Sequence, residues 1–314
     1  MSQLEKLNQC LACGSKSFDF YQVSKAQMHN EYEEYTFVKC SSCQLIMLNP
    51  RLKKTFLPHY YKDFYLPFRG PDAWGKFAPL VAKNLNKTDT KRIQLSQKVV
   101  KLDKASSVLD VGCGKPSFLK KIVEATNAYC KGIDFSDEGW RNDSKIYSKL
   151  DLEVSECHQF KTNKKFDLIT MWHYLEHDYE PLKTLLRLKE LVSINGRLII
   201  EVPNHNSSTR KLQKSNWEGY HTPRHTAIYT PETIKILLNN SGWQVDYIKT
   251  YGTLDAYPLF WMGRQERKGI DWSGSMEKKF YGFVLGMILT APIFWLKKWF
   301  SAGIMTIIAK PITQ

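Results

Sequence analysis

The sequence lacks the features that would place it in a specialised class of protein. Its first ten residues contain no apolar stretch of the kind that forms the hydrophobic region of a secretory signal. It has no internal repeat and no low-complexity tract, and its 43% hydrophobic and 24% charged residues are ordinary for a globular chain. The composition argues against disorder, collagen and a long coiled coil. A length of 314 residues suffices for two domains, or for one large domain with attachments.

Acidic residues are the scarce charge. The chain has 31 Asp and Glu against 45 Lys and Arg, which gives a formal net charge of +14. The excess lies before residue 106 and after residue 251, and the part between is nearly balanced. This excess of positive charge favours anionic partners, namely phosphate-bearing substrates, anionic lipid or nucleic acid.

Cysteine occurs in an odd number, seven, and four of the seven form two tight pairs. Cys10 and Cys13 make one C-x-x-C pair, and Cys40 and Cys43 make the other. Two such turns can supply the four thiolate ligands of a tetrahedral structural zinc ion, with no open position for catalysis. A redox dithiol pair or chance spacing is the alternative. The pattern suits a reducing cytoplasm better than a disulfide framework, so we expect a cytoplasmic protein with structural Zn²⁺.

Short apolar runs alternate with amphipathic stretches between residues 106 and 251. This alternation, with short connections, indicates an α/β fold in which helices cover both faces of a parallel sheet. A last strand near residues 303–311 is stopped by Pro311. The strands are expected at 108–111, 128–135, 166–172, 196–202 and 243–250, and the helices at 117–128, from 136, at 181–192 and at 231–242.

The flanking regions differ in composition from this part. Residues 1–50 are predicted to form a zinc ribbon, and residues 51–105 a helical connector or cap with a helix at 89–104. The main domain would then occupy residues 106–314, with an apolar helical insertion at about 252–301.

Within that insertion, residues 280–296 form an uncharged run flanked by Lys278-Lys279 and Lys297-Lys298. As a helix the run would be roughly 25 Å long, slightly short of a bilayer core of roughly 30 Å. We therefore expect a buried helix pair, or an apolar surface helix that rests on lipid or covers the active site, rather than a membrane span.

A glycine-rich turn follows the first strand of the main domain, in Leu109-Asp-Val-Gly-Cys-Gly114. Glycines at 112 and 114 would let a ligand approach the backbone closely. Asp134 ends the next strand, 24 residues after Asp110, where a carboxylate can accept hydrogen bonds from two ribose hydroxyls. The pattern predicts a nucleoside cofactor; a plain tight turn between strand and helix is the alternative.

These motifs resemble the cofactor-binding signature of class I S-adenosylmethionine-dependent methyltransferases. The segments that carry the resemblance are 109–114, 132–136 and 166–177. Together with the cysteine pairs, they resemble a subgroup with an N-terminal zinc ribbon that acts in sugar, polysaccharide and secondary-metabolite pathways. The resemblance implies a Rossmann-like sheet, mostly parallel with an antiparallel last strand. It also implies S-adenosylmethionine as cofactor, held by Asp110, Gly112, Cys113, Gly114, Asp134, Phe135 and Trp172.

One position departs from this family pattern, because Pro116 stands where glycine is usual. Proline fixes φ near −65° and lacks an N–H, which the first turn of a helix tolerates. If the loop were distorted instead, the protein would be a non-catalytic zinc-ribbon scaffold, and this alternative stays open.

Four histidines are candidates for a general base in methyl transfer. His173 and His177 follow the strand at 166–172, at the sheet edge where ligands bind in open α/β folds. His221 and His225 lie in a loop expected at the same edge. An imidazole suits the removal of a proton from a hydroxyl or carbon acid near neutral pH. A structural hydrogen-bonding role is the alternative for each.

Two charged residues lie between these histidines. Glu176 is expected to anchor a helix start or to contact substrate. The planar guanidinium of Arg224 could grip a phosphate or carboxylate, or form a surface salt bridge.

The expected function is methyl transfer from S-adenosylmethionine to oxygen or carbon of a small, sugar-like or otherwise anionic biosynthetic intermediate. A lipid-linked acceptor, with peripheral membrane contact through residues 280–296, is a further hypothesis. RNA or other nucleic-acid methylation is an alternative. Enzymes that methylate base amino groups usually place Asn/Asp-Pro-Pro-Tyr/Phe after the fourth strand, and this chain has Trp172-His-Tyr-Leu175 there.

Overall fold

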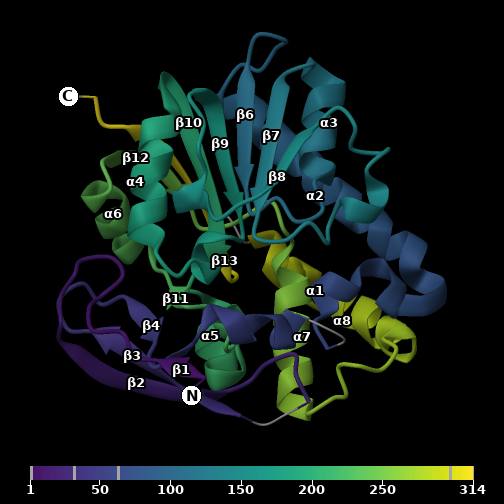
Figure 1. Ribbon diagram of the computed structural model, residues 1–314. Coiled ribbons are helices and arrows are strands. Elements are labelled where there is room, and N and C mark those ends of the chain that lie inside the picture. Colours follow the sequence, from purple (N-terminus) through teal and green to yellow (C-terminus); the bar gives the residue numbers. More distant parts are fainter. Residues whose placement is uncertain (1–2, 31–32, 62–63, 297–298, 314) are drawn as a thin grey trace.

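A seven-stranded sheet forms the centre of the computed structural model, which describes residues 3–30, 33–61, 64–296 and 299–313 (Figure 1). Its strands are β6 (Ser107–Val111), β7 (Tyr129–Asp134), β8 (Asp151–Val154), β9 (Phe166–Trp172), β10 (Val192–Pro203), β12 (Trp243–Lys249) and β13 (Ile304–Pro311). They lie in the order β12-β13-β10-β9-β6-β7-β8. Strands β6 to β10 pair in parallel, whereas β13 is antiparallel to β10 and to β12. The predicted fold class is therefore confirmed.

Helices cover both faces of this sheet. Successive residues of a strand point to opposite faces, so each strand contributes apolar side chains to both of the layers that the helices cover. Leu109, Ile169 and Ile200 share one core cluster with the helices α4 (Pro181–Leu191) and α6 (Pro231–Asn240). Their neighbours along the strands share the other cluster with α2 (Ala78–Val99) and α3 (Ser117–Thr126); these neighbours are Val108, Leu168 and Ile199. The near-continuous apolar runs in the strands thus reflect burial on both faces.

Local chemistry explains where several helices begin. The hydroxyl of Thr230 accepts the backbone N–H of Thr233, and the Thr233 hydroxyl accepts that of Thr230, which makes a capping box. Pro231 follows at the first helical position, where its missing N–H costs no bond. Helix α2 begins 11 residues before the predicted start at Asp89 and ends at Val99.

The helix predicted from Ser136 is not formed. The segment makes turns and a short 3-10 helix, η3 (Arg141–Asp143). The Ser136 hydroxyl accepts the backbone N–H of Glu138, which closes a tight turn instead of a helical one. A Cβ atom at Gly139 would lie 2.2 Å from the carbonyl oxygen of Gly114, so this backbone packs directly on the glycine loop.

The N-terminal region forms a second, smaller sheet in the order β11-β4-β3-β2. Strands β2 (Phe18–Lys25) and β3 (Glu34–Cys40) form a hairpin between the cysteine pairs, and β4 is Ile46–Leu48. The fourth strand, β11 (Ala227–Ile228), comes from far downstream and pairs antiparallel with β4. A separate two-stranded ladder joins β1 (Leu4–Glu5) to β5 (Arg51–Leu52). The small sheet thus includes residues that directly follow the second pair of histidines.

Short helices fill the space below the carboxyl ends of the parallel strands. They are η1 (Lys54–Tyr61), α1 (Leu66–Arg69), η2 (Gly70–Phe77), η5 (Leu175–His177), α5 (Ser208–Gln213), η6 (Lys214–Asn216) and η7 (Glu218–Tyr220). A short 3-10 helix elsewhere is η4 (Cys157–Gln159).

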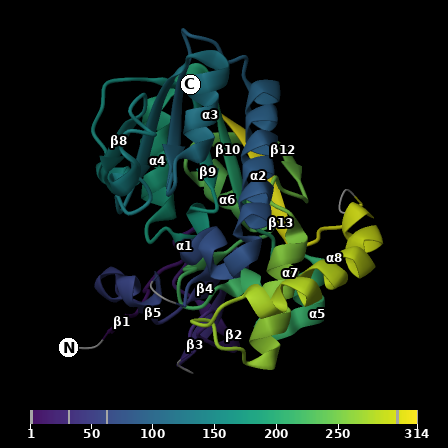
Figure 2. The same cartoon turned by 90° about the vertical axis from the view of Figure 1, so that its right-hand side faces the viewer.

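The C-terminal insertion forms the helices α7 (Ala256–Lys268), η8 (Glu277–Lys279) and α8 (Phe280–Trp295), and α8 contains nearly all of the apolar run. Helices α7 and α8 pack on each other at the rim of the molecule (Figure 2). Among the described residues, none of the helices combines the length and hydropathy that a bilayer crossing requires. Lys297 and Lys298, which flank the run in the sequence, lie outside the described residues.

Candidate active site

The glycine loop after β6 has a backbone that only glycine accommodates well. Gly112 and Gly114 have φ angles of 73° and 47°. A Cβ atom at Gly112 would lie 2.3 Å from the ring of Tyr174, whereas one at Gly114 would meet no atom within 4 Å. The loop is therefore tight against the protein at its first glycine and open at its second, as a backbone-lined ligand site requires.

Asp134 reaches this loop from the end of β7. One of its carboxylate oxygens accepts the backbone N–H of Gly114 at 2.9 Å, and the other accepts that of Ser136 at 3.3 Å. Burial raises the pKa of Asp134, partly offset by these amides. Asp110 is fully buried, accepts the Thr170 hydroxyl at 2.6 Å and has its pKa raised by burial to about 7. Asp110 thus ties β6 to β9, while Asp134 stands at the sheet edge.

The other three residues expected to hold a cofactor differ in exposure. Phe135 is 58% exposed, and its ring centre lies 6.0 Å from that of Tyr61. The side chains of Cys113 and Trp172 are buried in the core beneath α3, where Trp172 packs edge-on against Phe118. The structure therefore brings Phe135 to the surface beside the loop, and places the side chains of Cys113 and Trp172 in the core.

Pro116 occupies the position just before α3, with φ −79° and ψ 39°. The helix begins at Ser117, so the missing N–H of the proline interrupts no hydrogen bond within it. The loop before Pro116 keeps its open face at Gly114.

Three of the four candidate histidines meet below the parallel strands. The ring centres of His177 and His225 are 4.5 Å apart, and those of His221 and His225 are stacked at 4.7 Å. His177 ends η5, and His221 follows η7 with a left-handed backbone (φ 42°). A left-handed backbone is uncommon for a residue with a side chain, so this loop is held by its surroundings.

His173 is separated from that group by its partners. Its Nδ1 lies 3.3 Å from Glu176, and its Nε2 lies 3.3 Å from Glu201. Burial disfavours the charged imidazole, but the two carboxylates outweigh it and raise the pKa of His173 to about 9. His173 is therefore a cation at neutral pH and cannot accept a further proton.

His177 and His225 are neutral for the opposite reason. Burial lowers the pKa of His177 to about 4 and that of His225 well below its usual value. His177 Nδ1 is 3.0 Å from the Tyr61 hydroxyl. His225 donates from Nδ1 to the carbonyl of Gly219 at 2.8 Å, which leaves Nε2 unprotonated, 4.0 Å from Glu176. Ligand atoms of Glu176, His177 and His225 all lie within 4.8 Å of one another, which is also close enough to hold a cation.

His221 has the arrangement of a base held by a carboxyl group. Its Nδ1 lies 2.6 Å from Glu218 Oε1, while its buried Nε2 has no hydrogen-bond partner among the described residues. Burial lowers the pKa of His221 well below its usual value and raises that of Glu218 to about 8. A buried nitrogen without a partner is costly, unless a ligand contacts it.

Arg224 has a different role from either one predicted. It is fully buried, and its guanidinium donates to the backbone carbonyls of Tyr60, Gln27 and Met28 at 2.8–3.0 Å. The guanidinium also lies 4.6 Å from the ring centre of Tyr65. With its donors committed to the N-terminal region, Arg224 is neither a surface salt bridge nor a free grip for an anion.

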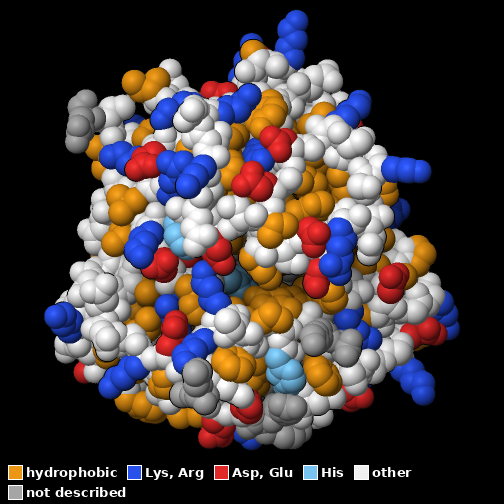
Figure 3. Space-filling model, viewed as in Figure 1, with side chains coloured by type: hydrophobic (Ala, Val, Ile, Leu, Met, Phe, Trp, Pro, Cys, Tyr) orange, Lys and Arg blue, Asp and Glu red, His pale blue; other side chains and the backbone are white. Residues whose placement is uncertain are grey.

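All four histidines line one cavity of about 1000 Å³. The rest of its wall is mostly apolar and comes from α1, η2, α2, α7 and α8, including Trp74, Trp261 and Phe283. Hydrophobic side chains border a hollow near the middle of the face in Figure 3. Gly112 and Gly114 are not among the residues that line this cavity.

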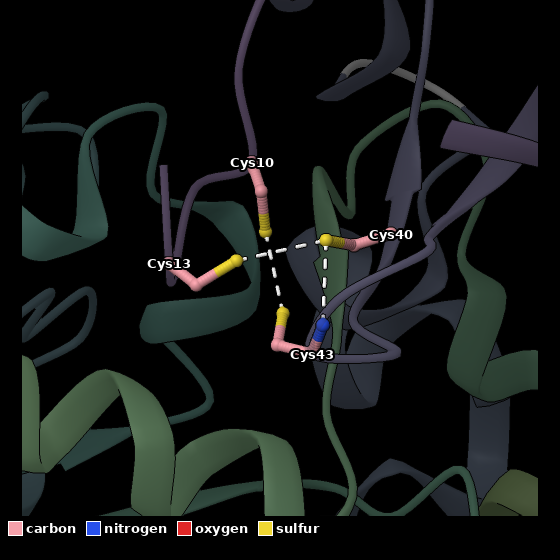
Figure 4. Close-up of side chains that lie close together, drawn as sticks. All are labelled: Cys10, Cys13, Cys40 and Cys43. Carbon is pink, nitrogen blue, oxygen red and sulfur yellow. Dashed lines mark hydrogen bonds between the residues drawn. The ribbon is translucent and has the colours of Figure 1, made fainter. Parts of the chain in front are cut away.

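The four N-terminal cysteines converge, as Figure 4 shows. The sulfur atoms of Cys10 and Cys43 are 3.5 Å apart, and those of Cys13 and Cys40 are 3.6 Å apart. Four sulfurs at about 2.3 Å from a tetrahedral zinc ion would be roughly 3.8 Å apart, so the cluster fits this metal. Burial raises the pKa of Cys10 and Cys43, and a cation would favour the thiolate of each.

A methyltransferase-domain family model matches residues 82–248, which is just over half of the chain. The chain belongs to this methyltransferase family. The expected cofactor is thus borne out at the level of the family.

Two curated relatives of this methyltransferase are named ubiquinone biosynthesis O-methyltransferase. The one from Aromatoleum aromaticum is 27% identical over 106 residues, and the one from Aeromonas salmonicida is 29% identical over 105 residues. Each match covers 32% of this chain and 44% of the relative. The chain thus spans less than half the length of the curated relatives it matches.

Solved structures share the fold of this methyltransferase at low sequence identity. A chain in the complex of the Haloferax volcanii Trm112 methyltransferase activator has a TM-score of 0.51 and 14% identity, and the match covers 77% of this chain and 98% of that one. The mycolic acid cyclopropane synthase CmaA1, complexed with SAH and CTAB, has a TM-score of 0.50 and 14% identity, with coverage of 70% and 82%.

Two contacts of the candidate histidines were not predicted from the sequence. Glu218 lies three residues before His221, and a carboxylate at that spacing in a short turn was the available signal. Tyr61 contacts His177 from 116 residues away, and nothing in the local sequence indicates this contact.

Proposed function

We propose that this methyltransferase transfers a methyl group to oxygen or carbon of a small-molecule acceptor, with a neutral buried histidine as general base. The observation that carries the proposal is the His221–Glu218 pair, whose Nε2 atom is unpartnered and borders the cavity. His177 and His225 are the other candidates, since both are neutral. His173 would act as a fixed positive charge that orients Glu176 and Glu201.

The residues proposed to bind S-adenosylmethionine lie at the neighbouring sheet edge. The open backbone at Gly114 and the carboxylate of Asp134 support this role, because they offer close approach and hydrogen-bond acceptors. Asp110 would hold the strand beneath, and Phe135 would cover the ligand from the exposed side. When bound, the cofactor supplies an activated methyl group on a sulfonium.

The base would act on the acceptor at the moment of transfer. His221 Nε2 would take the proton of an acceptor O–H or C–H group as the acceptor atom receives the methyl group that a bound cofactor would supply. Glu218 Oε1 would accept the Nδ1–H of His221, which fixes the tautomer that leaves Nε2 free to take this proton. The acceptor atom must be held in line with the methyl group that it receives. The walls of the cavity would supply this orientation.

The acceptor atom is proposed to belong to a sugar-like or anionic biosynthetic intermediate. An oxygen acceptor is supported by the name of the curated relatives, although these match over only part of their length. The basic excess of the chain favours an anionic group. We also propose that the cysteine cluster binds a structural Zn²⁺, and that residues 1–50 form a ribbon, residues 51–105 a connector and residues 106–314 the catalytic domain with an insertion near 252–301.

Binding and transfer are tested in sequence. Isothermal titration with S-adenosylhomocysteine measures the cofactor site. Tritiated methyl transfer is then followed into an extract of the cells that make the protein, separated into small-molecule, lipid and RNA fractions. The proposal expects binding, and label in the small-molecule or lipid fraction. Label confined to RNA, or no binding of S-adenosylhomocysteine at millimolar concentration, would contradict it.

A further inference from the structure

Helix α8 is apolar on all sides. One face, spaced three or four residues apart, lines the cavity and packs on α7 and η2; it consists of Phe280, Phe283, Val284, Met287, Ala291 and Phe294. The opposite face points outward and is exposed at Tyr281, Leu285, Ile288, Leu289, Ile293 and Leu296. Helices on a protein surface normally turn polar residues outward, so this outer face indicates a partner that is itself apolar.

The exposure of this outer face is extensive. Leu289 is 70% exposed, Trp295 is 78% exposed at the end of the helix, and Trp299 beyond it is 82% exposed. Aromatic side chains at the ends of an apolar segment suit the boundary between lipid tails and water. At about 1.5 Å per residue, 16 residues make a helix about 24 Å long, which can lie along a bilayer surface but is too short to cross it.

Basic residues surround this apolar face. Lys278 and Lys279 precede the helix directly, and Lys83 and Lys87 of α2 border the cavity that α8 walls. The acidic neighbours are engaged, because Glu277 pairs with Lys76 and Asp255 pairs with Lys91. An apolar face with lysines at its margin fits an anionic membrane surface.

The cavity behind α8 fits one chain of an amphiphile. Its volume of about 1000 Å³ is at the top of the range for small-molecule sites, roughly 300–1000 Å³, and its wall is mostly apolar. The histidines stand among its lining residues, together with Glu176 and Glu218. A single helix therefore separates an outward apolar surface from an apolar cavity that contains the candidate base.

We propose that the outer face of α8 docks on an anionic lipid surface, and that the cavity takes the apolar chain of a membrane-resident acceptor whose reacting head group lies at the histidines. The identity of the head-group reaction rests on the proposed function, whereas docking and chain binding do not. Lys83 and Lys87 would meet a phosphate or other anionic part of the acceptor.

Vesicle flotation of the full chain tests the docking surface. We expect the protein to float with vesicles of phosphatidylcholine and phosphatidylglycerol and only weakly with phosphatidylcholine alone. The double variant Leu285→Glu/Leu289→Glu should lose at least about tenfold in bound fraction, because both side chains are exposed apolar contacts. The matched control is Phe20→Glu/Ile194→Glu, which changes two side chains exposed to 70% and 74% on other elements.

The outcomes separate cleanly, because all four substitutions are at exposed positions and circular dichroism checks the fold. Docking through α8 is supported if only the α8 variant stops floating. It is overturned if the wild-type protein fails to float with anionic vesicles, if it floats equally with neutral ones, or if both double variants lose binding alike.

Titration with alkyl phosphates tests the cavity without any methyl transfer. Dodecyl phosphate below its micellar concentration should bind, and butyl phosphate should bind at least about tenfold more weakly. Ala291→Phe, on the inner face, should weaken dodecyl phosphate by about tenfold, while Gly282→Phe, which faces open space, should not. Equal binding of the two phosphates, or equal effects of the two variants, would refute the chain site. Failure of methyl transfer alone would leave these readouts unchanged.

Discussion

The protein carries two clusters of four side chains that have ligand-type atoms, and they are built in opposite ways. The four cysteines come as two local pairs, and their sulfurs face one another. The four histidines come from two segments about 50 residues apart, and each has a different partner: two carboxylates for His173, a hydroxyl for His177, a carboxyl group for His221 and a carbonyl for His225.

This difference separates a structural role from a chemical one. Four cysteine side chains that face one another leave no ligand position for a substrate. The free energy of binding a metal there would therefore stabilise the fold. A cluster whose members have distinct partners contains one cation and three neutral imidazoles, one of them with an unpartnered nitrogen, and it borders a cavity. Four tests would break or sharpen the comparison.

Loss of the metal should have the largest effect, and it should act on stability. The cysteines belong to the same core cluster as the central strands, so Cys40→Ser should lower the free energy of unfolding of the whole protein by several kcal/mol. Structural zinc contributes about 10–16 kcal/mol in small peptides. Zinc content by mass spectrometry and thermal unfolding with a chelator measure this. Cys157→Ala, a buried cysteine outside the cluster, should keep the metal. A wild-type protein without zinc would contradict the prediction.

Removal of the base should act on turnover instead. His221→Asn should lower the rate of methyl transfer by about 10²–10⁴-fold, because no other group takes the proton from the same position. Its affinity for S-adenosylhomocysteine should be unchanged, since His221 is not among the residues proposed to bind the cofactor. His158→Asn, on η4 and away from the cavity, is the control. A variant that transfers methyl groups as fast as the wild type would assign the base to another residue.

In the glycine loop, Gly112→Ala should weaken the binding of S-adenosylhomocysteine by about 10- to 100-fold. The added methyl group would clash with Tyr174 and the backbone would be strained at φ 73°. Gly269→Ala, at φ 60° with no atom within 4 Å, imposes the strain without the clash. Isothermal titration compares the two. If both variants bind as the wild type does, the loop is not the cofactor site.

The smallest effect concerns a buried histidine outside the cluster. His205 contacts the hydroxyls of Tyr21 and Tyr220 at 2.9 and 3.2 Å, and burial lowers its pKa to about 3. In the unfolded chain His205 takes up a proton near pH 6.5, whereas in the folded chain it stays neutral. The stabilisation that neutral His205 gives the folded state is therefore fully present above pH 6.5 and is lost as the pH falls toward 3.

Between pH 6.5 and 5.5 the wild type should therefore lose about 1 kcal/mol more unfolding free energy than His205→Gln does. Urea unfolding at the two pH values measures the difference. Parallel curves for the two proteins would mean that His205 is exposed or charged when folded.

The sequence predicted the features whose residues are neighbours along the chain. The cysteine pairs, the turn around Gly112 and the helix start at Thr230 are local, so spacing and residue type are enough. Contacts between residues that lie far apart in the sequence were not predicted. The structural role of Arg224 becomes evident only from its hydrogen bonds to the carbonyls of Gln27 and Met28.

Two further differences have the same origin. The segment from Ser136 was expected to be a helix, but Gly139 packs on the glycine loop instead. This is a tertiary contact, which local helix propensity does not indicate. The cavity collects residues from helices as far apart as α1 and α8, so periodicity within any one of them could indicate an apolar face but not what that face encloses.

The pairing of β11 with β4 has a consequence for the order of assembly. During synthesis the four cysteines leave the ribosome early, yet the sheet beside them lacks its last strand until residue 228 has been made. The N-terminal sheet therefore gains its last strand only after both pairs of histidines have been made, so its completion follows the synthesis of the histidine loop.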